Sequence, residues 1–257
     1  AIIYITSAAA IALIFFVIGI KSNLTEFKVL TPIPALNTAP IENTLYTERG
    51  VKGFLVLPDS TKGWLNSDSR LTYPEVFSGD TRNVQLVGEA YFEVRRDTLH
   101  PMIVNTNKNF SIEVLGTSFN VKCYDNDLTA ETTLYSGSIL MHYKNVTTAQ
   151  NETLLLKPNE SFTYTTGKIP VSVNYPKPEI KKEWKDGKLY FNNTPMTEVI
   201  KTLERWHGTQ FIVHNSNIYH YRLTAEFSSE SIVQIMEIMK ILMPIEYACD
   251  NNVVTLK

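Results

Sequence analysis

Two runs of the sequence decide the fold. Val84–Asp97 is VQLVGEAYFEVRRD, and Phe110–Asp125 is FSIEVLGTSFNVKCYD. Apolar and polar residues alternate in both, which is the period of a β-strand with one buried face. The apolar positions of the first run share one face: Val84, Leu86, Ala90, Phe92 and Val94. The alternation turns Tyr91 and Glu93 outward, so the pattern predicts core-forming strands in a β-rich domain.

The same pattern extends through residues 44–174. Short alternating runs recur roughly every 8–12 residues and are separated by Gly, Pro and Asn, while no long helical period is present. This spacing predicts an all-β domain that is a sandwich, a jelly roll or solenoid-like. A Pro-containing linker of residues 175–185 then precedes a different pattern in residues 186–257.

Residues 186–257 have the period of amphipathic helices. Thr194 can cap a helix with Pro195 at its first position, and Gly208 can end it. A second helix has Ser228 or Ser229 as its cap and stops before Pro244. A strand follows each helix, and Val253–Leu256 forms a last one.

The two helical patterns repeat at an offset of 36 residues. The equivalent apolar positions are Phe191 and Phe227, Met196 and Ile232, Val199 and Ile235, Ile200 and Met236, Leu203 and Met239, Trp206 and Leu242, and Phe211 and Tyr247. Two strand–helix–strand units predict a small α/β domain whose helices cover a sheet.

The N-terminal segment predicts a membrane anchor. Ala1–Ile20 carries no charge, and at ~1.5 Å per residue it spans a hydrocarbon core of ~30 Å. A cleaved signal peptide is the alternative, but the apolar run continues past the small residues Ser7–Ala10. Residues 21–43, with three prolines, are expected to form a stalk. We expect a cytoplasmic segment to precede Ala1.

Composition and motifs argue against most site chemistry. The net charge of −2 does not favour nucleic-acid binding, and the five histidines form no metal or catalytic motif, so no metal or cofactor is predicted. Glu89 and Glu93 lie about 13 Å apart on a strand, too far for glycoside chemistry. Cys123 and Cys249 are expected to be buried free thiols, with a disulfide in an oxidising compartment as the alternative.

Five motifs, in order, resemble the FecR family of anti-sigma regulators in the form found in Bacteroidetes-type bacteria. They are Pro58–Asn66 (PDSTKGWLN), Ser69–Pro74 (SRLTYP), Gly88–Val94 (GEAYFEV), Val114–Val121 (VLGTSFNV) and Leu134–Ser138 (LYSGS). Asp186–Phe191 and the repeat after it resemble the C-terminal domain of that family. That domain is similar to the short signalling domain (STN) of secretins and TonB-dependent transporters. The resemblance covers nearly all of residues 50–257.

The resemblance implies a role in signalling. Family members cross the bacterial inner membrane once and keep the bulk of the chain in the periplasm. Their cytoplasmic segment binds an extracytoplasmic-function (ECF) sigma factor, and their periplasmic part senses the N-terminal signalling domain of a TonB-dependent outer-membrane transporter. An intramembrane protease is expected to complete release by cutting Ala1–Ile20. No direct contact with nucleic acid is implied.

The Gly116–Thr117 bond has two interpretations. Gly116 can form a bend or bulge between two strands. Some family members instead cleave themselves at a Gly-Thr bond in this motif, which implies attack of the Thr117 hydroxyl on the Gly116 carbonyl. We expect no other enzymatic activity, and the sequence does not identify an activating base.

A partner's signalling domain is expected to bind by adding a strand to an exposed sheet edge. The candidate edges are Phe211–His214 and Val253–Leu256, with the candidate binding residues Phe211, Ile212, Val213, Val253, Val254 and Thr255.

Two other functions remain open from sequence. The β-rich part could be an anchored carbohydrate-binding module with Trp64, Tyr73 and Tyr91 as a stacking platform. That alternative leaves the C-terminal repeat unexplained. A secretin-like envelope adaptor explains the repeat but not the five β motifs.

Overall fold

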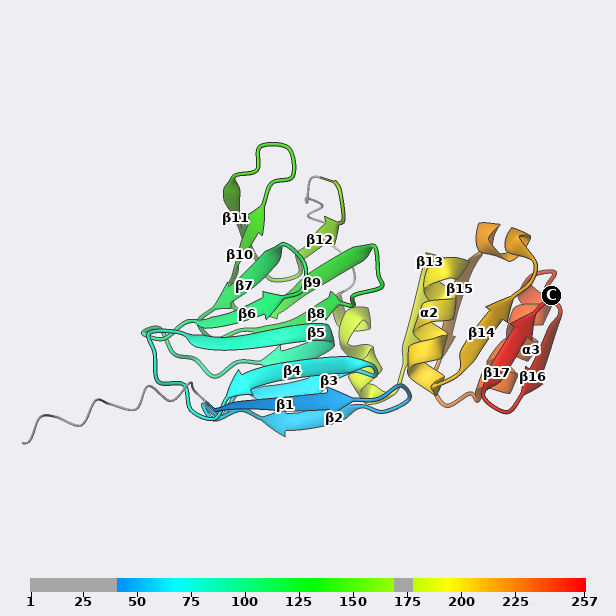
Figure 1. Ribbon diagram of the computed structural model, residues 1–257, viewed down its shortest axis with the longest axis horizontal. Coiled ribbons are helices and arrows are strands. Elements are labelled where there is room, and N and C mark those ends of the chain that lie inside the picture. The colour runs from blue at the N-terminus through cyan, green and yellow to red at the C-terminus, as the bar shows by residue number, and fades with distance from the viewer. Residues whose placement is uncertain (1–40, 169–177) are drawn as a thin grey trace, which may run out of the picture. The chain divides into compact units, whose positions relative to one another are not determined.

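The computed structural model describes residues 41–168 and 178–257 (Figure 1). The first part, here called the β domain, consists of strands β1 (Glu42–Thr47), β2 (Gly53–Val56), β3 (Lys62–Leu65), β4 (Ser69–Pro74), β5 (Arg82–Glu93), β6 (Met102–Thr106), β7 (Phe110–Val114), β8 (Ser118–Cys123), β9 (Thr129–Ser136), β10 (Ile139–Lys144), β11 (Asn151–Leu156) and β12 (Ser161–Thr165). The predicted all-β class is therefore confirmed for the described residues of this domain. β1 begins two residues earlier than the predicted domain boundary at residue 44.

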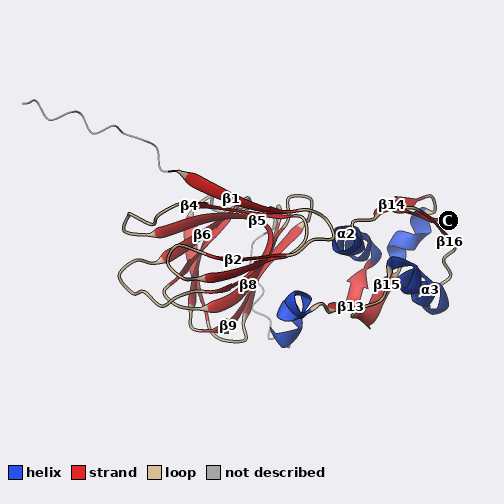
Figure 2. Cartoon of the chain, turned by 90° about the horizontal axis from the view of Figure 1, so that it is seen from below, coloured by secondary structure: helices blue, strands red, loops and turns tan. Residues whose placement is uncertain are grey.

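The strands form two layers that share β5. Sheet A has the order β1-β4-β5-β6-β7-β10-β11, and sheet B has the order β2-β3-β5-β8-β9-β12. Figure 2 shows the layers, with β1, β4 and β6 in one and β2, β8 and β9 in the other. Aromatic rings from the two sheets contact each other in the core. The ring centroids of Phe110 in sheet A and Phe162 in sheet B lie 5.6 Å apart. Of the predicted architectures, the two-layer sandwich agrees with this packing.

Gly88 allows β5 to pass from one sheet to the other. Residues before it pair with β4 and β6, and residues after it pair with β3 and β8. Gly88 has φ +110°, and a Cβ on it would lie 2.6 Å from the Cα of Ser69 in β4. Only glycine fits so close to a neighbouring backbone. The predicted inward residues are buried, because the alternation continues in phase through Gly88.

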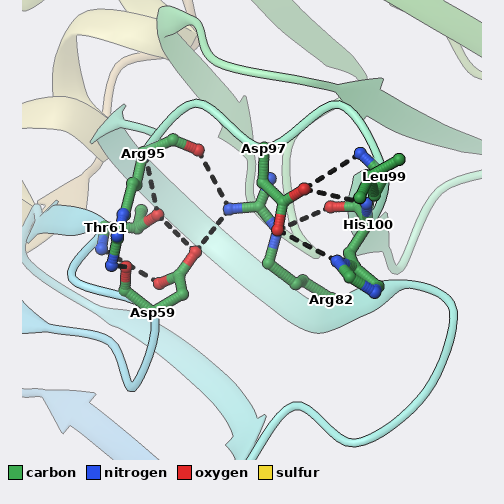
Figure 3. A network of polar contacts seen from close by, with 7 residues as sticks. All are labelled: Asp59, Thr61, Arg82, Arg95, Asp97, Leu99 and His100. Atoms are coloured by element: carbon green, nitrogen blue, oxygen red, sulfur yellow. Dashed lines mark hydrogen bonds and ion pairs between the residues drawn. The ribbon is translucent and has the colours of Figure 1, made fainter.

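A buried ion pair fixes the start of β5 (Figure 3). Nη1 of Arg82 lies 2.5 Å from Oδ2 of Asp59, in the turn between β2 and β3. That carboxylate also accepts hydrogen bonds from the N–H and hydroxyl of Thr61. Arg82 further donates to the carbonyl oxygens of Arg95 and His100. The guanidinium therefore ties the start of β5 to two loops, the β2–β3 turn and the β5–β6 connection.

Asp97 closes the loop that follows β5 (Figure 3). Its carboxylate lies 3.0 Å from Nδ1 of His100 and accepts the backbone N–H groups of Leu99 and His100. The hydrogen bonds from the His100 ring and from these two N–H groups lower the pKa of Asp97 to about 2. This loop is therefore ordered by a charged acceptor at neutral pH.

The predicted linker contains a 3₁₀ helix, η1 (Pro178–Asp186), that packs on the outer face of sheet B. A row of rings crosses this face from Phe54 through Trp64 and Tyr91 to Tyr135. Nζ of Lys185 lies 5.7 Å from the centroid of the Tyr91 ring. Tyr91 faces away from the core as predicted, but it is buried because η1 covers it.

The C-terminal domain contains two small sheets, whereas the sequence predicted a single sheet covered by helices. Its elements are β13 (Leu189–Pro195), α2 (Met196–His207), β14 (Gln210–Val213), η2 (Ser216–His220), β15 (Arg222–Phe227), α3 (Ile232–Leu242), β16 (Tyr247–Asp250) and β17 (Val253–Leu256). β13 pairs with β15, and the order in the second sheet is β14-β17-β16. α2 and α3 begin 36 residues apart, in agreement with the predicted offset. Each sheet combines strands of both units, β13 with β15 in one and β14 with β17 and β16 in the other, which periodicity does not reveal.

The helix caps differ from the prediction. α2 begins at Met196, and Pro195 occupies the N-cap position without a side-chain hydrogen bond, because β13 continues as far as Pro195. α3 is capped by Ser231, three residues later than Ser228, in a capping box with Gln234. The apolar faces of both helices contribute to a second core, separate from that of the β domain.

No helix within residues 41–168 and 178–257 has the length and apolar character needed to cross a membrane. The predicted anchor Ala1–Ile20 and nearly all of the predicted stalk lie outside the described residues.

Candidate functional site

The β domain and the C-terminal domain meet at Arg205 of α2. Pro40–Lys257 forms one compact unit by its contacts. The buried guanidinium of Arg205 makes a two-pronged pair with Asp127, with Nη2–Oδ1 at 2.6 Å and Nη1–Oδ2 at 3.0 Å. It also donates to Oδ1 of Asn126 and lies 3.7 Å above the ring of Tyr124. We call this set of contacts the α2 joint.

Charge is retained at the α2 joint. Burial raises the pKa of Asp127, but the hydrogen bond from Arg205 and the charges of Lys122, Arg205 and Lys201 outweigh burial, so the pKa of Asp127 is lowered. Burial likewise opposes the charge of Arg205, but the hydrogen bond that Arg205 donates to Asp127 outweighs it and raises the pKa of Arg205. Lys201, one helical turn earlier, adds a weaker contact to Asp127 at 3.7 Å. The pair is therefore ionised at neutral pH.

Lys52, in the loop before β2, reinforces the joint. Its Nζ lies 3.6 Å from the centroid of the Trp206 ring and donates to the carbonyl oxygen of Trp184 at 2.8 Å. The N–H of Gly50 donates to the carbonyl oxygen of Arg205 at 2.7 Å. The contacts across the joint are mainly polar, which is typical of interfaces between domains that move relative to one another.

Three of the motifs quoted from the sequence converge beside the joint. The Glu89 carboxylate accepts hydrogen bonds from Nδ2 of Asn66 at 2.9 Å and from Nδ2 of Asn120 at 3.0 Å. Oδ1 of Asn120 in turn accepts the indole N–H of Trp184. These residues line a cavity of about 560 Å³ that Arg205 also borders. Strand residues of the β domain thereby hold η1, which leads into the C-terminal domain.

The Gly116–Thr117 bond lies in the connection between β7 and β8. Gly116 has φ +156°, and a Cβ on it would lie 2.8 Å from the Cα of Arg96. Thr117 is 3% exposed, and its hydroxyl donates to the carbonyl oxygen of Ser138 at 3.0 Å. The register between β8 and β9 shifts between Ser118 and Phe119, just after this bond.

The two predicted edge strands have different positions. β14, which contains Phe211, Ile212 and Val213, pairs with β17 alone and is an edge within the described chain. β17, which contains Val253, Val254 and Thr255, lies between β14 and β16. The prediction that β17 is a free edge is therefore wrong, because both sides of its backbone are hydrogen-bonded. Partner binding at β14 stays a prediction.

The two cysteines and the three aromatic residues that the sequence suggested do not form shared sites. Cys123 is buried, and burial raises the pKa of its thiol to about 12, whereas Cys249 is exposed; both are free thiols. Trp64 and Tyr91 share the outer face of sheet B, but Tyr73 lies on β4 in sheet A. The fold does not bring these three aromatic residues together as a stacking platform.

Sequence reasoning missed the α2 joint. Arg205 lies outside the apolar stripe of its helix, and its partner Asp127 is 78 residues away in the chain. One signal was available, because Trp184 stands alone among charged residues in the predicted linker. A tryptophan in such a segment favours docking onto a surface over a solvated tether.

Comparisons with known proteins agree with this architecture. Residues 43–140 match the family described as FecR protein, and residues 188–256 match the family described as FecR, C-terminal. No curated protein matches the chain significantly.

Two crystal structures of a candidate anti-sigma factor from Parabacteroides distasonis resemble the chain. The structure at 1.65 Å has a TM-score of 0.76 and 26% identity, and the similarity covers 84% of this chain and 98% of that chain. The structure at 2.50 Å has a TM-score of 0.76 and 27% identity with the same coverage. The coverage exceeds either domain alone, so the likeness includes both. The chain therefore belongs to the FecR family of anti-sigma factors.

Proposed function

We propose that this chain is an inner-membrane anti-sigma regulator that crosses the membrane once and places residues 41–257 in the periplasm. In this proposal, the C-terminal domain senses the N-terminal signalling domain of a TonB-dependent transporter. The signal then passes to an ECF sigma factor through a cytoplasmic segment that precedes Ala1. The main observation in support is that a C-terminal FecR domain with an open strand edge contacts the β domain through α2.

Affinity capture tests this proposal. The full chain, purified in detergent, serves as bait for a bacterial envelope extract, and retained proteins are identified by mass spectrometry. We expect recovery of a TonB-dependent transporter, and loss of that recovery when the transporter lacks its N-terminal domain. Retention of the chain on a glycan column without any transporter would contradict the proposal and favour a binding module. Recovery of secretin components alone would favour an envelope adaptor.

We further propose that the chain cleaves itself between Gly116 and Thr117. The Thr117 hydroxyl oxygen attacks the Gly116 carbonyl carbon, the C–N bond breaks, and the nitrogen takes the hydroxyl proton. Water then hydrolyses the resulting ester to a Gly116 carboxylate and regenerates the hydroxyl of Thr117, now an N-terminal residue. The backbone packed around Gly116 and the buried Thr117 hydroxyl support this step.

Intact mass measures this cleavage directly. After long incubation the wild-type chain is expected to give two fragments that meet at residues 116 and 117. Thr117→Val removes the nucleophile at similar volume and should stay full length, whereas Thr117→Ser should still be cut. A wild-type chain that remains entirely full length would contradict self-cleavage and leave Gly116 with a structural role in the connection between β7 and β8. Release by an intramembrane protease remains part of the proposed pathway.

A further inference from the structure

The free edge of β14 can be assigned residue by residue. The N–H groups of Gln210 and His214 donate to carbonyl oxygens of the β17 side, those of Asn252 and Leu256. In a parallel pair the backbone groups of alternate residues face opposite sides of the strand. The N–H groups of Phe211 and Val213 therefore face away from β17, toward the open edge.

A side chain of α2 occupies half of this edge. Oε1 of Glu204 accepts the outward N–H of Phe211 at 3.0 Å. The outward N–H of Val213 has no hydrogen-bond partner among the described residues. The Glu204 carboxylate thus takes the place that a carbonyl oxygen of an added strand would fill. Covering an edge in this way is a common means of preventing unwanted strand pairing.

The surroundings of the edge suit an extended peptide. Ile212 is 41% exposed and lies on the sheet face opposite to that of the buried Phe211. A strand placed beside β14 could cover Ile212 with an apolar side chain while its backbone bonds to Val213. The opposite edge, β16, also has outward N–H groups, but no α2 side chain covers them among the described contacts.

Glu204 is adjacent in sequence to Arg205, which makes the α2 joint. Both belong to the last turn of α2, which ends at His207. Glu204 therefore holds the C-terminal sheet, and Arg205 holds Asp127 of the β domain. A change at one contact alters the helical turn that carries the other.

We propose that Glu204 gates the β14 edge. A strand of the partner's signalling domain displaces the carboxylate from Phe211, pairs with β14, and thereby disturbs the α2 joint. The inference rests on the proposed function for the identity of the partner. The gate itself belongs to this chain and can be tested without a partner.

Hydrogen exchange by NMR on the full chain in detergent tests the gate alone. In Glu204→Ala the Phe211 amide should exchange about tenfold faster, since the lost hydrogen bond involves a charged acceptor. Glu204→Gln keeps an oxygen acceptor and should give a smaller change. The Gly50 amide, which reports on the joint, should also exchange faster in Glu204→Ala. An unchanged Phe211 amide would overturn the gate, and an unchanged Gly50 amide would overturn its coupling to the joint.

Binding to the N-terminal signalling domain of the captured transporter tests the edge. Glu204→Ala should bind about fivefold to tenfold more tightly than the wild type, because a competing acceptor is removed. Val213→Pro removes an outward N–H and replaces a partly buried side chain with an apolar one of the same number of carbons, so it should abolish binding. Cys249→Pro makes the equivalent change on β16 and should leave affinity unchanged.

The binding outcomes separate the two proposals. Loss of binding in Cys249→Pro but not in Val213→Pro would contradict pairing at β14. It would leave the transporter domain as the partner. Absence of any captured transporter would overturn the proposed function, whereas the gate would still be decided by the exchange of the Phe211 amide.

Discussion

Replacing Gly88 with alanine should destabilise the β domain by about 4 kcal/mol or more, which is in the exceptional range for one substitution. An alanine at φ +110° costs about 1–2 kcal/mol from the backbone conformation alone. The new methyl group would also lie 2.6 Å from the Cα of Ser69. Because that atom belongs to the backbone of β4, the clash can be relieved only by separating β4 from β5. Urea unfolding followed by circular dichroism measures the loss.

Gly79 provides the matched control. It lies in the loop between β4 and β5, and a Cβ there would have no atom within 4 Å. Gly79→Ala should therefore change the free energy of unfolding by no more than about 0.5 kcal/mol. Equal stabilities of the two variants would show that β5 does not depend on a close approach at Gly88.

Replacing Asp127 with alanine should open the α2 joint. The substitution leaves the guanidinium of Arg205 buried without its carboxylate, and breaking a buried pair in this way costs about 3–5 kcal/mol. Since the two domains have separate cores, the expected result is separation of the domains and not their unfolding. The Gly50 amide, bonded to the Arg205 carbonyl oxygen, should exchange about 100-fold faster.

Lys201 separates the specific effect from a general loss of charge. Its side chain is 33% exposed and lies 3.7 Å from the same carboxylate. Lys201→Ala should therefore cost less than about 1 kcal/mol. If Lys201→Ala opened the joint as much as Asp127→Ala, the two-pronged pair with Arg205 would not be the main contact.

The same joint should weaken in acid. The pKa of Asp127 is lower in the folded chain than its ordinary value of about 3.9. Its contribution is therefore fully present above that value and is lost as pH falls through the folded pKa. Arg205 keeps its proton throughout, because its pKa is raised. The protection of the Gly50 amide, taken relative to the intrinsic exchange rate at each pH, should therefore fall in acid. In Asp127→Asn this fall in protection should disappear.

Periodicity predicted the parts of the fold in which one face is buried. Leu86 and Phe92 on β5, and Val199 and Leu203 on α2, are buried as their spacing indicates. This works because the alternation of a strand and the turn of a helix decide which side chains share a face. The repeat at 36 residues follows from the same signal.

Strand order and long-range polar contacts are not encoded in local spacing. The sequence around Val253–Leu256 resembles that of a terminal edge strand, but β16 folds back beside it and makes it central. Glu204 and Arg205 are ordinary charged residues of a helix until the tertiary structure places Phe211 and Asp127 beside them. The role of such residues depends on their partners. Arg205 has a partner that is distant in sequence, and Glu204 has a backbone N–H group as its partner.

The shared strand β5 has a further consequence for a chain cut between Gly116 and Thr117. The cut leaves β1–β7 on one fragment and the later strands on the other. β5 still pairs with β8 from Gly88–Cys123 to Glu93–Ser118, and β7 still pairs with β10. The fragments are thus interlocked in both sheets as a non-covalent heterodimer, which would separate on a denaturing gel but elute as one species from a native column. What the cut removes is the covalent connection that carries tension along the chain.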